Sequence, residues 1–354
     1  MTIRIEPRKN VSAMKAYVPP LEGRRSGESL LLDFNERTIP PSADVVNALK
    51  EFAEKGNLQI YPEYGPVTEA LAKYLAIDKT FLMLANGSDN AIDTIMRCYL
   101  ELGEKILIPQ PSFTMFAHSA QLQAAQILTA TYTKEKGFPL AEVKSILSAG
   151  DIKMCVICNP NNPTGSIIDQ ASVEKLVKDF PRTMFLLDEA YYEFLEETSL
   201  SLALRYHNVV LTRTFSKAMG IPALRFGYVV ALPEVIAELV KVRGPYAVNM
   251  MSVTAVLAAL KNPAYVGAYA KEVMSVSKPE MEAFYHEKGI PFWPSGTNFH
   301  LIEPPIKDLA TKLEVEKIKI RPMSYKGFEN TVRISIGTLD DTRKILNALR
   351  KILS

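Results

Sequence analysis

Cysteine, long apolar runs and an excess of one sign of charge are all scarce in this sequence of 354 residues. Only three cysteines are present, which argues against a scaffold held together by disulfides. The apolar run at 250–260 falls well short of the ~20 residues that a helix needs to cross a bilayer. The 41 basic and 39 acidic side chains almost cancel, so no broad basic surface is expected for nucleic acid.

The first ten residues also lack the apolar stretch and small-residue cleavage site of a secretory signal. With the low cysteine count, this predicts a cytoplasmic protein in a reducing compartment. Neither a membrane nor a nucleic acid is expected as a partner.

What the sequence does contain is typical of a globular protein. Hydrophobic residues make up 47% of it and charged residues 23%, which excludes a disordered chain. A protein of this size buries roughly 75% of its extended-chain surface. Its length favours about two domains.

Short apolar runs alternate with helical patterns through the middle of the chain. The runs are KILIP (105–109), MCVIC (154–158), TMFLL (183–187), VVLT (209–212) and GYVVA (227–231). Unbroken apolar strands are covered on both faces, which predicts an α/β fold with a mostly parallel sheet between two layers of helices. Such sheets bind ligands at the carboxyl ends of their strands.

The sequence changes character near both ends, and this predicts the domain boundaries. Prolines interrupt the first forty residues, and Ser42 is a plausible N-cap of an amphipathic helix. Prolines also become frequent after about residue 255, where VRISIG (332–337) alternates like a half-buried strand. We expect an N-terminal arm at 1–41 that completes the small domain, a large domain at 42–255, and a small α+β domain at 256–354.

Four polar clusters lie where strands are expected to end or helices to begin. They are NGSDN (86–90), NPNNPTG (159–165), DEAYYEF (188–194) and TRTFSKAMGIPALRFGY (212–228). Each cluster alone is weak evidence of a site. Their common position at one edge of the predicted sheet is much more specific.

Lys217 and Asp188 are the residues in these clusters that could carry chemistry. A lysine is ordinarily a surface residue, but one held in a turn after a strand could form a Schiff base with an aldehyde if its pKa is lowered. Asp188 could simply cap the next helix. Alternatively, it could keep a pyridine nitrogen protonated and so make that ring an electron sink.

The same clusters contain a possible anion site. Gly87, Ser88 and Asp89 begin a helix, where free backbone N–H groups attract anions, although plain capping is an equal explanation. Arg225 alone reads as a surface ion-pair residue, but beside Thr214 and Ser216 it could neutralise a phosphate.

Two other kinds of site lack their sequence signals. Cys155 and Cys158 form a C-x-x-C, but on a strand these positions face opposite sides, and the four histidines have no metal-ligand spacing. No G-x-G-x-x-G follows a strand, which disfavours a nicotinamide oxidoreductase. We expect no metal site.

The order of these clusters resembles the fold-type I pyridoxal-phosphate aminotransferases, and most closely the histidinol-phosphate aminotransferase family. The resemblance extends from AYVPP (16–20) to VRISIGT (332–338). It implies a three-layer αβα large domain and a smaller α+β domain, with pyridoxal 5′-phosphate bound covalently to Lys217. Asp188 would pair with the pyridine nitrogen, and Tyr191 and Asn162 would reach the cofactor's phenolic oxygen.

The resemblance also implies the remaining site residues. The cofactor phosphate would be bound by Gly87, Ser88, Asp89, Thr214, Ser216 and Arg225. Phe113 would stack on the ring, and Tyr61 would reach the phosphate in the neighbouring subunit of a homodimer. Arg333 would bind the substrate's anionic group, helped by Arg321, Tyr17 and Asn162. The family's usual N-E-N-P reads Asn35-Glu36-Arg37-Thr38 here, and the usual final glutamate of G-S-D-E reads Asn90.

The function that the resemblance implies is transamination of L-histidinol phosphate with 2-oxoglutarate, a step of histidine biosynthesis. Lys217 would be the general base, and the kinetics would be ping-pong. Within the same fold, an aromatic amino-acid aminotransferase or a threonine-phosphate decarboxylase are alternatives. An alternative of a different class is a regulatory module that kept the fold without catalysis, but Lys217, Asp188 and Arg225 are all present.

Overall fold

The computed structural model describes residues 5–24, 27–56 and 58–354. Residues 1–4 and 25–26 of the predicted N-terminal arm, and Asn57 of the predicted large domain, lie outside these ranges. Within them, no helix is long and apolar enough to cross a membrane.

The described part of the chain contains a seven-stranded sheet in the order β2-β8-β7-β6-β5-β3-β4. Its strands are β2 (Leu82–Ala85), β3 (Lys105–Leu107), β4 (Gln126–Leu128), β5 (Ile152–Cys158), β6 (Met184–Asp188), β7 (Val209–Thr214) and β8 (Gly227–Val230). Strands β3 to β7 are parallel, and β8 is antiparallel to both β7 and β2. The predicted apolar runs thus form a mostly parallel sheet.

Helices cover both faces of this sheet and make the fold a three-layer αβα arrangement. The helices are α2 (Ala43–Lys55), α3 (Gly65–Leu75), α4 (Gly87–Tyr99), α5 (Thr114–Leu122), α6 (Leu140–Ser148), α7 (Gln170–Asp179), α8 (Tyr192–Leu195), α9 (Leu200–Ala203), α10 (Pro233–Val242) and α11 (Met250–Ala259), with a 3₁₀ turn at Lys79–Phe81 and another at Pro222–Leu224. One core contains residues of α4, α5 and α10, and the other contains residues of α3, α6, α7 and α11. Cys155 belongs to one core and Cys158 to the other, as the alternation of a strand requires.

A smaller α+β unit follows. Its three-stranded antiparallel sheet has the order β11 (Arg321–Pro322), β12 (Val332–Ser335), β9 (Phe299–Ile302). Its helices are α13 (Lys278–Lys288), α14 (Leu309–Val315) and α15 (Leu339–Ile352). The prediction that VRISIG is half-buried was wrong, because β12 is the middle strand and all four of its residues are buried.

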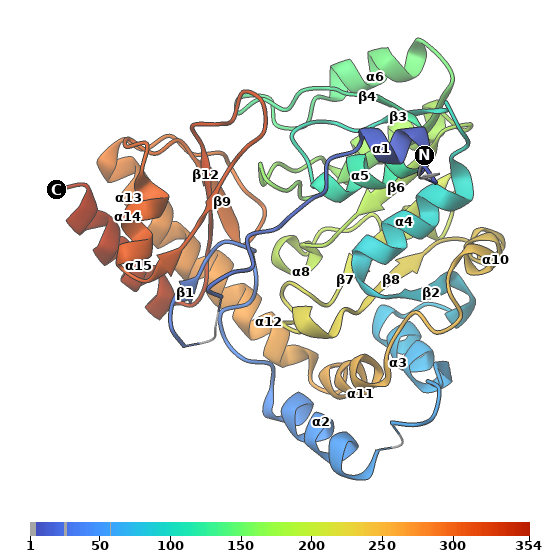
Figure 1. The fold of residues 1–354 in the computed structure, drawn as a ribbon, viewed down its shortest axis with the longest axis horizontal. Helices are drawn as coiled ribbons and strands as arrows, with labels where there is room; N and C mark the ends of the chain where they lie inside the picture. The colour runs from blue at the N-terminus through green and yellow to red at the C-terminus, as the bar shows by residue number, and fades with distance from the viewer. Residues whose placement is uncertain (1–4, 25–26, 57) are drawn as a thin grey trace.

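Two segments connect the large and small units (Figure 1). Helix α12 (Pro263–Glu272) continues through a π-helical turn, Val273–Ser277, into α13. The N-terminal arm runs from α1 (Lys9–Ala13), beside α5, to β1 (Leu30–Leu31), which pairs in parallel with β10 (Ile318–Lys319). The arm therefore contributes a strand to the small unit. The boundaries at 41/42 and 255/256 stay predictions.

Candidate active site

A cavity of about 520 Å³ lies at the carboxyl ends of the central strands. A smaller hollow of about 250 Å³ adjoins it toward β11 and β12. Predicted site residues that line the larger one are Tyr17, Ser88, Asp89, Phe113, Asn162, Asp188, Tyr191, Thr214, Ser216, Lys217 and Arg225. The smaller one shares Tyr17, Phe113, Asn162 and Lys217 and adds Arg321 and Arg333. Segments far apart in the sequence thus meet, because parallel strands end at the same edge of their sheet.

Lys217 lies in a tight turn just after β7. The turn is closed by the Gly220 N–H, which donates to the Lys217 carbonyl, and Gly220 has a φ of +74°, which glycine adopts without strain. The Lys217 ammonium donates to the Phe34 carbonyl at 2.8 Å. Burial, and then the positive charge of Arg333, lowers the pKa of this amine to about 8. A lysine with such a pKa can become a nucleophile or a base near neutral pH.

Asp188 is the last residue of β6 and is almost completely buried. One of its oxygens accepts a hydrogen bond from the Ala190 N–H at 3.1 Å. Burial raises the pKa of this carboxyl to about 7, and no cation among the described residues forms an ion pair with it. A buried acid in this state suits a cationic ring nitrogen as its partner.

The opposite end of the cavity is built for an anion. The Arg225 guanidinium donates to Ser216 Oγ at 3.1 Å and to Asp89 Oδ2 at 3.0 Å, and the Thr214 hydroxyl donates to Ser216 Oγ at 2.9 Å. Gly87 begins α4 directly against Arg225. These hydroxyl groups, the guanidinium and the N-terminus of α4 make a site with the chemistry of a phosphate cup.

Gly227 shows why this cup can be so compact. A Cβ at residue 227 would lie 2.7 Å from the Ser88 nitrogen. Strand β8 and the first turn of α4 therefore approach each other only because residue 227 has no side chain.

Between the two ends lie the side chains predicted to contact a ring. The Tyr191 hydroxyl accepts a hydrogen bond from the Asn35 amide at 2.9 Å. Asn162 Oδ1 accepts from Arg333. Phe113 lines both hollows and makes an edge-to-face contact with Phe116 of α5. This leaves an aromatic wall and polar groups on either side of the space above Lys217.

The smaller hollow is cationic. Arg321 and Arg333 are cross-strand neighbours on β11 and β12, and both line it together with Tyr17 and Tyr325. Within the described ranges, buried N–H groups on both guanidiniums, Nη1 of Arg321 and Nε of Arg333, have no hydrogen-bond partner. None of the described residues that line this hollow is acidic. It is therefore suited to an anionic group.

Tyr61 lies outside both hollows of its own chain. The residue is 73% exposed, and its ring stacks on that of Tyr246, with 4.2 Å between ring centroids. Two exposed aromatic rings stacked on the surface are unusual for an isolated chain.

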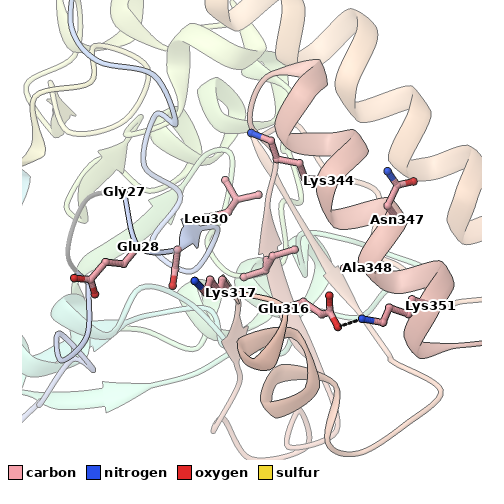
Figure 2. Close-up of a pocket in the computed structure, with 11 residues that line it drawn as sticks. Gly27, Glu28, Leu30, Glu316, Lys317, Lys344, Asn347, Ala348 and Lys351 are labelled. Atoms are coloured by element: carbon pink, nitrogen blue, oxygen red, sulfur yellow. Dashed lines mark hydrogen bonds and ion pairs between the residues drawn. The ribbon is translucent and has the colours of Figure 1, made fainter.

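A separate hollow of about 640 Å³ lies on the small unit (Figure 2). It is bounded by Leu30, Lys317 and the α15 residues Lys344 and Lys351, and Glu316 pairs with Lys351 there. None of the predicted site residues lines it. We place the candidate site at the sheet edge for that reason.

Sequence reasoning missed several residues that line the site. Phe34 and Glu36 line the larger cavity, and Asn35 and Tyr325 line the smaller one. The only signal of the segment 35–38 in the sequence is its departure from the family pattern. Tyr325 lies in a loop, where its hydroxyl donates to the Ser112 carbonyl, and no sequence signal marked it.

The chain as a whole is similar to known proteins. A family model described as "Aminotransferase class I and II" matches residues 28–349. The chain is 32% identical over 351 residues to histidinol-phosphate aminotransferase 1 of Trichormus variabilis, covering 98% of each protein. It is 35% identical over 347 residues to a dihydroxyacetone phosphate transaminase of Campylobacter jejuni, covering 94% of each. The crystal structure of histidinol-phosphate aminotransferase from Sinorhizobium meliloti, in complex with pyridoxal 5′-phosphate, superposes with a TM-score of 0.89 at 21% identity, over 99% of this chain and 98% of that one.

Proposed function

This chain belongs to the class I and II aminotransferases and is a pyridoxal-phosphate-dependent enzyme of fold type I; on that premise we propose that it transfers the amino group of L-histidinol phosphate to 2-oxoglutarate. The contacts of the two adjoining hollows support the role of each residue in that reaction.

The residues of the larger cavity fit the cofactor. Lys217 would hold it through its amine, and the cup of Ser88, Thr214, Ser216 and Arg225 would bind its phosphate. Asp188 forms no ion pair with a cation among the described residues, so a protonated pyridine nitrogen would supply the positive charge that this buried acid lacks. When bound, the cofactor ring withdraws electrons and so stabilises negative charge on the carbon that carries the substrate's amino group.

Lys217 would move the proton in the reaction. Its pKa of about 8 leaves a useful fraction of the amine neutral near pH 7 to 8, so it can take the proton from the substrate carbon and return it elsewhere. Asp188 would hold the proton on the pyridine nitrogen throughout. Tyr191 and Asn162 would orient the ring through its phenolic oxygen.

The observation that carries the substrate proposal is the pair of guanidiniums in the smaller hollow. Arg321 Nη1 and Arg333 Nε are buried without partners among the described residues, and leaving such groups unsatisfied is costly. A phosphate group would accept from both arginines, and the carboxylate of 2-oxoglutarate could take the same place in the second half of the reaction. Tyr17 and Tyr325 hydroxyl groups line the same hollow.

A second candidate reaction is the amination of dihydroxyacetone phosphate. It is favoured by the 35% identical relative of that name. Its product, 2-amino-3-hydroxypropyl phosphate, has the same 2-aminopropyl phosphate skeleton as histidinol phosphate and differs in bearing a hydroxyl in place of the imidazole. The paired arginines suit both compounds.

We also propose a homodimer in which Tyr61 reaches the neighbouring active site. The exposure of Tyr61 and its stacking on the exposed Tyr246 support a surface that is covered in an assembly. A cytoplasmic location stays a prediction from composition.

The test is a substrate panel on the cofactor-loaded enzyme, with the half-reaction followed by absorbance. The amines are histidinol phosphate, 2-amino-3-hydroxypropyl phosphate, phenylalanine, tyrosine and phosphothreonine. We expect the phosphorylated amines to react fastest, and histidinol phosphate fastest of all. Faster reaction of phenylalanine or tyrosine would overturn the phosphate assignment, and release of CO₂ from phosphothreonine would indicate a decarboxylase.

Two variants make the panel decisive. Arg321→Gln should raise KM for the phosphorylated amine roughly 10- to 100-fold, because one charge-assisted hydrogen bond is lost. Lys319→Gln is the matched control: it removes a positive charge two residues away, where the ammonium donates to the Glu22 carbonyl at 3.1 Å, and should leave KM unchanged. Equal effects of the two variants would contradict a specific role for Arg321.

A further inference from the structure

Asn35 occupies an unusual position in the N-terminal arm. Its backbone is in the left-handed region, with a φ of +55°, and its side chain is almost completely buried. Asparagine is one of the few residues other than glycine that tolerate this backbone. The arm thus turns sharply at Asn35, directly after the Phe34 carbonyl that accepts from Lys217.

Four hydrogen bonds fix the orientation of Asn35. Its N–H donates to Ser335 Oγ at 2.9 Å, and the Ser335 hydroxyl donates to Asn35 Oδ1 at 3.1 Å. The Asn298 amide donates to the Asn35 carbonyl at 3.2 Å. Because Oδ1 faces Ser335, the amide NH₂ faces Tyr191 and donates to its hydroxyl oxygen at 2.9 Å.

This orientation decides what the Tyr191 hydroxyl can do. A tyrosine hydroxyl can accept a hydrogen bond and donate one. Its oxygen already accepts from Asn35, and within the described ranges no other hydrogen bond of this hydroxyl is formed. The hydrogen of Tyr191 therefore stays available for a group in the cavity that Tyr191 lines.

We propose that Asn35 is a positioning residue that makes Tyr191 a hydrogen-bond donor to the phenolic oxygen of the cofactor. The proposal rests on the proposed function, because it presumes that Tyr191 contacts this oxygen. Asn35 does not itself touch the cofactor; it acts through Tyr191. Ser335 belongs to β12 and lies two residues from Arg333. The orientation of the Tyr191 hydroxyl therefore also depends on the strand whose Arg333 is proposed to bind the substrate.

The surroundings of Tyr191 favour the donor role. Burial raises the pKa of its hydroxyl, so the hydrogen is retained at all working pH values, while the nearby Arg333 charge and the Asn35 amide oppose that rise. The other ionisable groups around it are Asp188, the Cys158 thiol and Lys217, whose nitrogen lies 5.8 Å from the Tyr191 ring centroid. Phe299 of β9 packs edge-to-face on the same ring, 5.2 Å between centroids.

The experiment reverses the hydrogen bond with a substitution of almost the same shape. Asn35→Asp keeps a residue that tolerates the left-handed backbone, but its carboxylate only accepts. The Tyr191 hydrogen should then turn toward residue 35 and leave the cofactor. A hydrogen bond donated to the phenolic oxygen draws electron density from it and weakens its hold on the proton of the adjoining lysine–cofactor linkage. Losing that bond should therefore raise the pH midpoint of the cofactor's visible absorbance change.

The measurement is this midpoint in wild type, Asn35→Asp, Tyr191→Phe and the double variant, together with the affinity of each apoprotein for pyridoxal phosphate. We expect Asn35→Asp to raise the midpoint by about one pH unit, the worth of one hydrogen bond. The shift should be less than half as large when Tyr191 is replaced, because only the through-space effect of the new charge then remains. The affinity for pyridoxal phosphate should fall several-fold in Asn35→Asp and little further in the double variant.

One more variant separates hydrogen bonding from charge. Ser335→Ala frees the Asn35 amide to rotate without adding charge. It should raise the midpoint in the same direction as Asn35→Asp, which provides a test even if the latter does not fold.

The outcomes are distinct. If Tyr191→Phe leaves the midpoint unchanged, the proposed contact of Tyr191 with the cofactor is wrong. If Tyr191→Phe shifts it, but Asn35→Asp gives equal shifts in both backgrounds and Ser335→Ala gives none, the role of Asn35 is wrong while the proposed function stands.

Discussion

Replacing Asp188 by Asn should have opposite effects on the apoprotein and on the cofactor-loaded enzyme. The carboxyl is almost completely buried, and burial raises its pKa from 3.8 to about 7. The charged form is therefore the costly one in the apoprotein. Asparagine has nearly the same shape and no charge, so it removes this cost.

The size of the effect follows from the pKa difference. A rise of about three units at 1.36 kcal/mol each corresponds to on the order of 4 kcal/mol. Because the folded-state pKa is raised, the contribution of this group to the free energy of unfolding is fully present below pH 3.8 and is lost as the pH rises to about 7. Apoprotein carrying Asp188→Asn should therefore gain stability relative to wild-type apoprotein as the pH rises from 5 to 8.

In the loaded enzyme the same substitution should be harmful. Breaking a buried charge pair costs ~3 kcal/mol or more, and each 1.36 kcal/mol corresponds to a factor of ten. We expect kcat/KM to fall by at least about a hundred-fold. Pyridoxal phosphate should also raise the melting temperature of the variant less than that of the wild type.

The assay is thermal unfolding of apo and loaded protein at pH 5 and 8. Asp179→Asn is the control, since it removes a surface carboxylate that pairs with Lys175, and it should show no pH-dependent difference from wild type. Identical pH profiles of Asp188→Asn and wild-type apoprotein would refute the reasoning that burial of this charge is the dominant cost.

Three further predictions concern the rest of the site. Because burial lowers the pKa of Lys217 to about 8, the rate at which the apoprotein captures pyridoxal phosphate, followed by absorbance, should level off just above pH 8. A capture rate that keeps rising past pH 10, as for a free lysine, would contradict this. Lys217→Ala should bind the cofactor without turnover. Arg333→Lys should raise KM for the phosphorylated amine roughly 10-fold or more with a smaller change in kcat, because an ammonium cannot reproduce the bidentate contact of a guanidinium. Steady-state kinetics that show only an effect on kcat would argue against binding of the phosphate by Arg333. If Tyr61 completes the neighbouring site, a re-associated equal mixture of Tyr61→Ala and Lys217→Ala subunits should recover about a quarter of wild-type activity, because each hybrid dimer has one intact site. No gain in activity over the separate variants would mean that Tyr61 acts only within its own subunit.

The sequence alone determined the sheet and the position of the chemistry at its edge. Unbroken apolar runs are typical of strands that are covered on both faces, and polar clusters follow those strands at their carboxyl ends. Local patterns could therefore locate β3, β5, β6, β7 and β8 and the surroundings of Lys217, Asp188 and Arg225, whereas β2 and β4 were not among the predicted strands. The family resemblance added the cofactor, which the comparisons support.

Only the tertiary structure decided what these residues face. The alternation in VRISIG predicts one exposed face, but both faces of β12 are covered. One face packs with α13 and α15, and on the other Arg333 contacts Asn162 of the large unit and Ser335 contacts Asn35 of the N-terminal arm, which no local pattern records. In the sequence, Asn35 stands out only as part of the segment 35–38 that departs from the family pattern. Its role depends on contacts with Tyr191 and with Ser335 of β12, which lie 156 and 300 residues away from it. The periodicity of apolar residues indicates which side of a helix or strand is buried. The direction of a hydrogen bond between distant segments depends instead on how the whole chain is packed.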